Sequence, residues 1–176
     1  MAQRYLIALG SNQRHHRHGR PEQVLRAALA VLERCGIKVQ RASPIIASAP
    51  LGPSLRRYAN GAAVVKTRLD PAELLDTLKG IEAEFGRRRG GQRWASRVLD
   101  LDIVLWSGGA FGSDTLTVPH PAFRSRSFVL TPALTIAPTW RDPISGLSLR
   151  QLGARLTKRL TRPRPLPRRR PVGEGP

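Results

Sequence analysis

Short segments with the pattern of β-strands alternate with segments that have the periodicity of amphipathic helices along this 176-residue chain. Two segments carry apolar residues at helical spacing. The first begins at Pro21 and ends before Gly36, and the second follows the acidic N-cap Asp70 and ends at Gly86. Proline in the first turn and glycine after the last turn are typical helix boundaries. Extended segments are predicted at residues 5–9, 37–47, 58–67 and 98–106.

The order of these elements is strand, helix, strand, strand, helix, strand. That order predicts an α+β protein with the ferredoxin-like βαββαβ plan, a mostly antiparallel sheet with helices packed on one face. A further helix within 126–136 is expected to break or end near Pro132, and Ser148 begins a capping-box pattern that opens a last helix. One domain is expected at 1–160, followed by a disordered Pro/Arg-rich tail at 161–176.

The amino-acid composition limits the class of protein to which this chain can belong. The chain has 30 Lys and Arg against 12 Asp and Glu, a net charge of +18, which attracts polyanions such as nucleic acid or a nucleoside triphosphate. The single cysteine, Cys35, excludes a disulfide scaffold and a thiol zinc cluster, and we expect it to be a small packed hydrophobe. Neither a membrane-spanning run nor the apolar stretch of a signal peptide is found, so a cytoplasmic protein is expected.

Asp100 and Asp102 are the strongest local candidates for chemistry. They are two positions apart in an alternating strand, so both project from one face. Carboxylates suit Mg²⁺, and the basic stretch 87–97, which has five arginines and no acid, leads directly into this strand. This combination of carboxylates and arginines fits phosphoryl transfer, although the sequence contains no Walker loop of the form Gly-x-x-x-x-Gly-Lys. The alternative is that both aspartates are solvated residues of a half-exposed strand.

Histidines form a second set of candidates. His120 lies between Pro119 and Pro121, so a rigid extended segment displays it, although a surface histidine without a chemical role is the alternative. Three other histidines lie close together in the polar loop 13–20. They lack a fourth ligand, so we expect surface residues there and not a metal site.

Several short motifs occur in one order between about residues 4 and 138. They are Gly10-Ser11-Asn12, Pro50-Leu51-Gly52-Pro53, Tyr58-Ala59-Asn60, Ile81-Glu82, Arg93-Trp94, Arg97 to Asp102 and Thr117-Val118-Pro119-His120-Pro121. Together they closely resemble the 6-hydroxymethyl-7,8-dihydropterin pyrophosphokinase family of folate biosynthesis. The fold known for that family is the same ferredoxin-like plan. One motif alone would be weak, but the ordered set is specific.

The resemblance implies a Mg²⁺-dependent diphosphotransferase. Such an enzyme transfers pyrophosphate from ATP to the hydroxymethyl group of the reduced pterin and releases AMP. The resemblance implies two Mg²⁺ ions held by Asp100 and Asp102, with Arg87 and Arg97 as the catalytic arginines nearest the transferred phosphates. It implies ATP and a reduced pterin as small-molecule partners, and we expect a monomer that binds neither membrane nor nucleic acid.

The resemblance also implies two sets of binding residues. Expected nucleotide contacts are Glu82, Arg89, Trp94, Ile103, Thr117, His120 and Arg126. Expected pterin contacts are Ser48, Leu51, Tyr58, Asn60 and Phe128. In the family, the loop matching Arg89 and Trp94 closes over the substrates and excludes water. Ordinary core packing is the alternative for Tyr58 and Phe128.

Three departures from the family pattern leave alternatives open. Lys79 replaces a usual glutamine, Ala95-Ser96 replaces a common Gly-Pro, and Thr115 stands where some members have arginine. One alternative is therefore a relative that binds ATP and pterin but turns over poorly. The other is a basic nucleic-acid-binding module, although neither apolar strand has the aromatic pattern with which such sheets stack bases.

Overall fold

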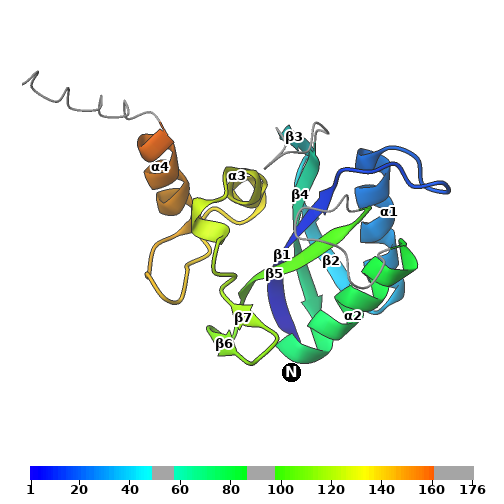
Figure 1. The fold of residues 1–176 in the computed structure, drawn as a ribbon. Helices are drawn as coiled ribbons and strands as arrows, with labels where there is room; N and C mark the ends of the chain where they lie inside the picture. The colour runs from blue at the N-terminus through cyan, green and yellow to red at the C-terminus, as the bar shows by residue number, and fades with distance from the viewer. Residues whose placement is uncertain (49–57, 87–97, 161–176) are drawn as a thin grey trace, which may run out of the picture.

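The sheet is built from five strands in a computed structural model that describes residues 1–48, 58–86 and 98–160 (Figure 1). All of its pairings are antiparallel, in the order β2-β4-β1-β5, and β3 also pairs with β4. The strands are β1 (Gln3–Ser11), β2 (Lys38–Ala42), β3 (Ile46–Ser48), β4 (Tyr58–Thr67) and β5 (Asp100–Trp106). A small hairpin follows, formed by β6 (Phe111–Gly112) and β7 (Thr117–Val118).

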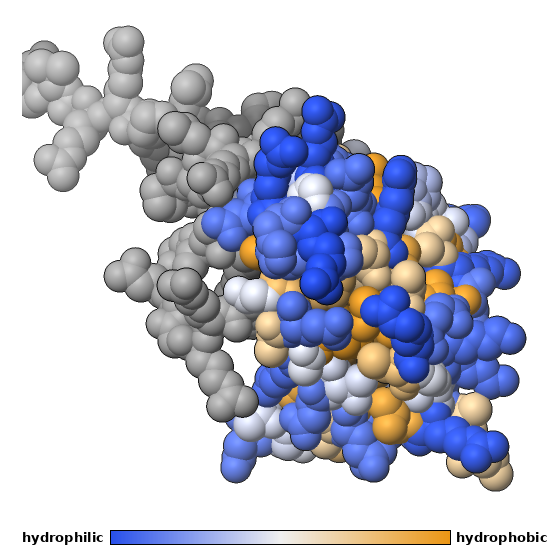
Figure 2. All heavy atoms as spheres, turned by 90° about the vertical axis from the view of Figure 1, so that its right-hand side faces the viewer, coloured by the Kyte–Doolittle hydropathy of each residue, from blue (hydrophilic) through white to orange (hydrophobic). Residues whose placement is uncertain are grey.

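Helices cover both faces of this sheet. The chain forms α1 (Pro21–Arg34), α2 (Pro71–Glu84), the short 3-10 helix η1 (Phe123–Ser125), α3 (Ser127–Ile136) and α4 (Leu149–Leu160). Figure 1 shows α1 and α2 on one side of the sheet and α3 and α4 on the other. The outer surface of the α1 and α2 layer is largely hydrophilic, with hydrophobic residues exposed in patches (Figure 2). Within the described ranges, no helix is both long enough and apolar enough to cross a bilayer.

The period-two alternation of β1 explains why two helix layers are needed. Tyr5 and Ile7 are fully buried in a core shared with α1 and α2, whereas Leu6 and Ala8 belong to a second core shared with α3 and α4. The expectation that helices pack on one face is correct for α1 and α2. It is wrong for α3 and α4, because the apolar residues on the second face also require cover.

Local signals start and end the first two helices as predicted. Asp70 Oδ1 accepts the N–H groups of Ala72 and Glu73, both at 2.9 Å, and Glu73 Oε2 accepts the N–H of Asp70 at 2.8 Å. Gly86, directly after the C-cap of α2, has φ +85°, a conformation that favours glycine. Cys35 is exposed at the C-cap of α1, so its predicted packing is wrong.

Two further expectations fail where packing overrides local pattern. Helix α3 continues through Pro132, because its buried residues, Ala133 and Ile136 among them, pack on the second core and outweigh the one lost hydrogen bond. Strand β5 contains a bulge opposite β1, where Leu6 pairs with Leu105 but Ile7 pairs with Ile103. Regular alternation along this strand would put Ile103 and Leu105 on one face, but the extra residue moves Leu105 into the second core.

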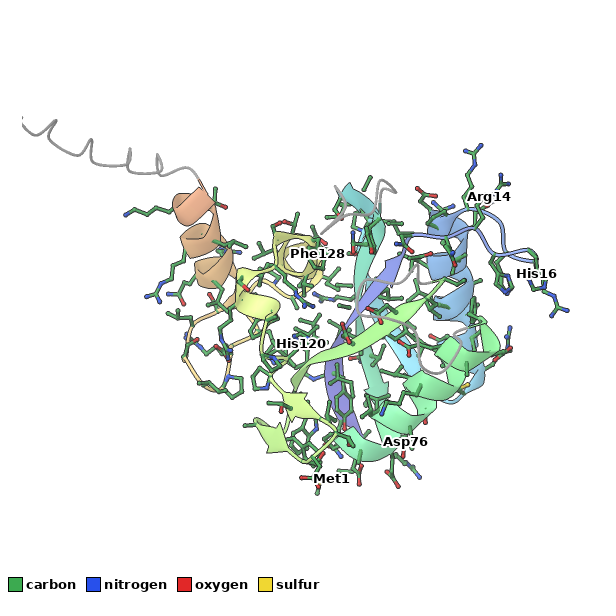
Figure 3. All side chains as sticks on the ribbon, in the orientation of Figure 1. Met1, Arg14, His16, Asp76, His120 and Phe128 are labelled. Atoms are coloured by element: carbon green, nitrogen blue, oxygen red, sulfur yellow. The ribbon has the colours of Figure 1, made fainter. Side chains whose placement is uncertain are left out.

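The histidine loop before α1 is packed more closely than expected for surface residues. His15 is only 9% exposed, and its Nδ1 accepts the N–H groups of Arg17 and His18, both at 3.1 Å. The ring of His18 stacks on Phe85 with centroids 4.9 Å apart, which ties the loop to the end of α2. His16 is exposed on the outer side of this loop (Figure 3).

Protonation of His15 should destabilise the folded protein. Burial lowers the pKa of His15 from its ordinary value of 6.5, and the neighbouring His16, His18 and Arg17 lower it further. The unfolded chain therefore takes up this proton first, so the stability contributed by His15 is present above pH 6.5 and is lost as the pH falls through the folded pKa.

Urea unfolding should therefore show a loss of stability from about pH 7.5 to about pH 5.5 in the wild type. His15→Gln removes the titrating group and should flatten this dependence. His16→Gln removes only a secondary cause of the lowered pKa of His15 and should therefore keep most, but not all, of the wild-type slope. An unchanged slope in His15→Gln would contradict the assignment of the effect to His15.

Candidate active site

Strand register brings the main polar candidates to one face of the sheet. Gly10 of β1 pairs with Asn60 of β4 on one side and with Asp100 of β5 on the other. Asp102 pairs with Ala8, which belongs to the second core. Since every second residue of a strand projects from the same face, Asn60, Asp100 and Asp102 all project toward the α3 side of the sheet.

Gly10 leaves the space between these polar side chains open. A Cβ atom at this position would lie 3.7 Å from Asn60 Oδ1 and 3.8 Å from Asp100 Cβ. The amide and the carboxylate therefore flank a stretch of bare backbone. The extended segment was expected to end at residue 9, but β1 continues through Gly10 to Ser11. A glycine inside an apolar strand is itself a signal of close approach, which the sequence interpretation missed.

The pterin candidates of β3 and β4 lie together at one end of this face. Asn60 is 5% exposed, and its Nδ2 donates to Ser48 Oγ at 2.7 Å. Ser48 pairs with Tyr58, whose side chain is half-buried. Phe128, at the start of α3, is half-buried against the second core. The structure thus places these four predicted residues on the α3 side of the sheet.

The segment after β7 brings His120 to the same side of the sheet (Figure 3), and it brings Arg126 to the start of α3. The N–H of His120 donates to the carbonyl oxygen of Val104 in β5 at 3.1 Å, and His120 Nδ1 accepts the N–H of Ala122 at 3.2 Å. Arg126 is the N-cap of α3, and its guanidinium lies 5.8 Å from the centre of the Phe128 ring. Both candidate nucleotide contacts therefore come from the segment that joins β5 to α3.

Two predicted nucleotide contacts lie on the opposite face. Ile103 is 2% exposed in the core beneath α1 and α2, because it alternates with Asp102 along β5. Glu82 of α2 is also 2% exposed, and its Oε1 accepts the N–H of Leu101 at 2.7 Å. Leu101 separates Asp100 from Asp102, so Glu82 anchors the backbone between the two aspartates. The structure does not bring either side chain to the face of the aspartates, and their nucleotide contacts stay predictions.

The remaining candidates divide between exposed and undescribed positions. Thr117 is exposed on β7, Thr115 is exposed before it, and Lys79 is exposed on α2 as expected for a solvated helix residue. Other predicted positions lie outside the described residues, as does the predicted tail at 161–176. These are Leu51, Arg87, Arg89, Trp94, Ala95, Ser96 and Arg97.

Sequence comparisons point to one family. The family model described as 7,8-dihydro-6-hydroxymethylpterin-pyrophosphokinase matches residues 6–138. The chain is 42% identical over 129 residues to the 2-amino-4-hydroxy-6-hydroxymethyldihydropteridine pyrophosphokinase of Synechocystis, and 41% identical over 145 residues to that of Pseudomonas aeruginosa. These alignments cover 73% and 81% of this chain, and 66% and 86% of the two relatives. They confirm the predicted family.

Solved structures support the fold. The crystal structure of wild-type Plasmodium falciparum HPPK-DHPS matches with a TM-score of 0.72 and covers 91% of this chain. The identity is 14%, so this likeness concerns the fold alone. This chain spans 42% of that longer chain.

Removal of the Glu82 carboxylate should weaken the attachment of β5. Glu82→Ala leaves the buried N–H of Leu101 without this acceptor, and the free energy of unfolding should fall by about 1–3 kcal/mol. Glu82→Gln keeps an acceptor oxygen and should lose less. Glu84→Ala, at an exposed position of the same helix, is the matched control in urea unfolding. Equal stabilities of Glu82→Ala and Glu84→Ala would show that the Leu101 contact contributes nothing.

Proposed function

Since the chain belongs to the 7,8-dihydro-6-hydroxymethylpterin-pyrophosphokinase family, we propose that it transfers a pyrophosphoryl group from ATP to the hydroxymethyl oxygen of a reduced pterin. The relatives' names refer to this pyrophosphokinase, and a plant relative is named a folate synthesis protein. One structural observation supports the proposal most strongly. The pairing of Gly10 with both Asn60 and Asp100 puts an amide and a carboxylate on either side of an open backbone position, and we propose that the amide binds the pterin and the carboxylate binds the metal.

The strand order supports the finer interpretation of the fold. Helices α1 and α2 connect strands of one antiparallel sheet, whose order is β2-β4-β1-β5. We interpret this arrangement as the ferredoxin-like plan with β3 added beside β4 and with α3 and α4 added on the second face. The additions form the side of the molecule on which the polar face lies.

Asp100 and Asp102 have the chemistry that Mg²⁺ requires. Both are half-buried and project from one face, and their carboxylate oxygens are hard ligands. Within the described residues there is no group of three or more His, Cys, Asp or Glu arranged to hold a metal. The proposed magnesium site therefore combines this pair with phosphate oxygens of the nucleotide, a common arrangement for this ion. When bound, Mg²⁺ neutralises phosphate charge and so assists attack at phosphorus.

His120 and Arg126 are suited to bind the polyphosphate. His120 Nδ1 accepts a backbone hydrogen bond, so the neutral ring carries its proton on Nε2 and presents a donor there. The planar guanidinium of Arg126 can donate two parallel hydrogen bonds to a phosphate. In our proposal these two side chains hold the nucleotide against the aspartate face, so that the β-phosphorus is in line with the attacking hydroxyl.

Asn60 and its neighbours are suited to bind the pterin. The bond from Asn60 Nδ2 to Ser48 Oγ fixes the amide plane, which leaves a pre-oriented group to hydrogen-bond the edge of a flat ring. Tyr58 and Phe128 supply aromatic surface on the same side. A ring held there would direct its hydroxymethyl group across Gly10 toward Asp100. We also propose that the protein acts as a monomer, as expected from the sequence.

The direct test is AMP release from ATP by the purified protein in the presence of Mg²⁺ and 6-hydroxymethyl-7,8-dihydropterin. The proposal expects AMP that depends on the pterin and disappears with EDTA. Binding of both ligands without AMP would show a member that does not turn over. AMP production without pterin would indicate a different nucleotide reaction.

Loss of either aspartate should abolish turnover while the fold remains. We expect Asp100→Asn and Asp102→Asn to lower kcat at least about 100-fold, because each removes one charge from the metal site but keeps the side-chain shape. Asp76→Asn, exposed on α2, is the control and should match the wild type. Circular dichroism checks that the variants fold. Wild-type kcat in both site variants would exclude the aspartates from the reaction.

A further inference from the structure

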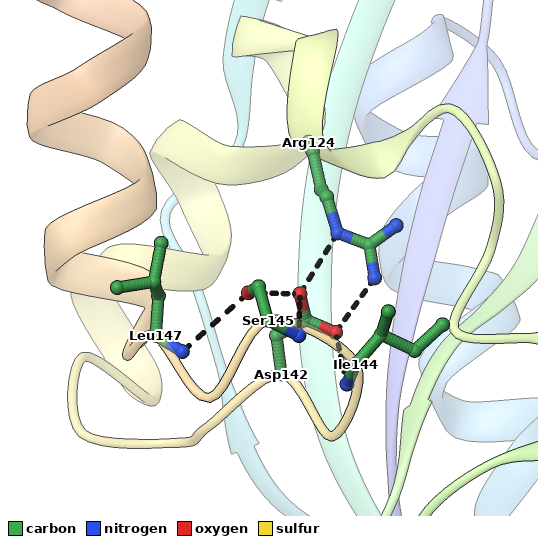
Figure 4. A network of polar contacts seen from close by, with 5 residues as sticks. All are labelled: Arg124, Asp142, Ile144, Ser145 and Leu147. Atoms are coloured by element: carbon green, nitrogen blue, oxygen red, sulfur yellow. Dashed lines mark hydrogen bonds and ion pairs between the residues drawn. The ribbon is translucent and has the colours of Figure 1, made fainter.

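An ion pair between a fully buried aspartate and a partly exposed arginine connects the proposed phosphate-binding segment to the loop that follows α3. Arg124 lies in η1, between His120 and Arg126. Its Nε donates to Asp142 Oδ2 at 2.8 Å and its Nη2 donates to Asp142 Oδ1 at 2.7 Å (Figure 4). Asp142 lies beyond residues 6–138, which the family model matches.

The loop that contains Asp142 is held by hydrogen bonds to the Asp142 carboxylate. Asp142 is 0% exposed. Its Oδ1 accepts the N–H of Ile144 at 3.2 Å, and its Oδ2 accepts both the N–H of Ser145 at 3.3 Å and the Ser145 hydroxyl. Burial acts to raise the pKa of Asp142, but the bonds from Arg124, Ser145 and Ile144 prevail and lower the pKa to about 2. The pair is thus ionised at neutral pH.

Backbone hydrogen bonds connect the helix η1, which contains Arg124, to both His120 and Arg126. The N–H of Phe123 donates to the carbonyl oxygen of His120 at 3.1 Å, and the N–H of Arg126 donates to the carbonyl oxygen of Phe123 at 3.3 Å. Phe123 is fully buried, and the Arg124 guanidinium lies 4.7 Å from the centre of its ring. His120, η1 and Arg126 are therefore one hydrogen-bonded unit, in which Arg124 is clamped on one side by Asp142 and on the other by Phe123.

We propose that Asp142 is a positioning residue for nucleotide binding. Through the two bonds to Arg124 it fixes the orientation of η1, so that His120 and Arg126 converge on the polyphosphate of ATP. A bidentate carboxylate and guanidinium pair sets direction as well as distance, which a single contact does not. This inference rests on the proposed function, since it assigns a role toward the nucleotide of the same site.

A purely structural role for the pair makes a different prediction. Removal of one partner of a buried pair destabilises a protein whether or not the pair serves binding. Loss of stability is therefore expected in either case and does not decide the question. The deciding quantity is the affinity for MgATP, measured by calorimetry at a temperature at which circular dichroism shows the variant fully folded.

Asp142→Asn is the principal variant, because it keeps the side-chain shape but removes the charge and one acceptor oxygen. We expect the Kd for MgATP to rise about tenfold, with a matching rise in KM for ATP and a smaller change in KM for the pterin. Arg141→Gln is the matched control. Arg141 is exposed on the same loop and donates to the Gly146 carbonyl at 2.9 Å, so its loss disturbs the loop but not η1.

Further variants test whether Asp142 acts on MgATP binding through Arg124. Arg124→Gln and Arg124→Gln/Asp142→Asn should both weaken MgATP binding as much as Asp142→Asn does, because the three variants break one connection. Wild-type affinity in folded Asp142→Asn, with only a lower melting temperature, would overturn the positioning role. If wild-type protein binds no MgATP, the proposed function itself fails. Should Asp142→Asn not fold, Arg124→Lys, which keeps the charge but loses the bidentate fork, decides by the same affinity measurement.

Discussion

The antiparallel pairing of β1 with both β4 and β5 is the constraint on which the structure depends. This pairing puts Gly10 between Asn60 and Asp100 and puts Ala8 opposite Asp102. Because side chains alternate between faces, a slip of one residue in β5 would turn Asp100 and Asp102 into the apolar core beneath α1 and α2. The apolar residues on both faces of β1 resist such a slip, so the cores also fix the geometry of the site.

The polar face is held from several directions. Glu82 reaches β5 from the α2 side and accepts the Leu101 N–H, while the N–H of His120 donates to the carbonyl of Val104 in the same strand. The strand that carries the aspartates is thus bonded to a helix of one layer and to the segment that leads into the other. A small displacement of a reacting group costs a large part of the rate, so this attachment has direct value for in-line transfer.

Sequence reasoning predicted helices α1 and α2, the capping of α2 by Asp70 and the common face of Asp100 and Asp102, because these depend on local chemistry and period-two alternation. The extended segment expected at 37–47 is instead divided into β2 and β3. The family followed from ordered motifs and is confirmed. The passage of α3 through Pro132 and the burial of His15 could not be predicted, since tertiary packing decides both. The partner of Arg124 was also missed, because no local pattern links it to Asp142. The roles of Arg87, Arg89, Trp94, Arg97 and Leu51 stay predictions.

The proposed function depends most directly on the binding of the divalent metal by Asp100 and Asp102 at one face of the sheet. A titration of the protein and an ATP analogue with Mn²⁺, followed by electron paramagnetic resonance, tests it without relying on turnover. We expect two Mn²⁺ ions in all in the wild-type complex of protein and nucleotide, and fewer bound Mn²⁺ ions in both Asp100→Asn and Asp102→Asn. The same amount of bound Mn²⁺ in the wild type and both variants would contradict it.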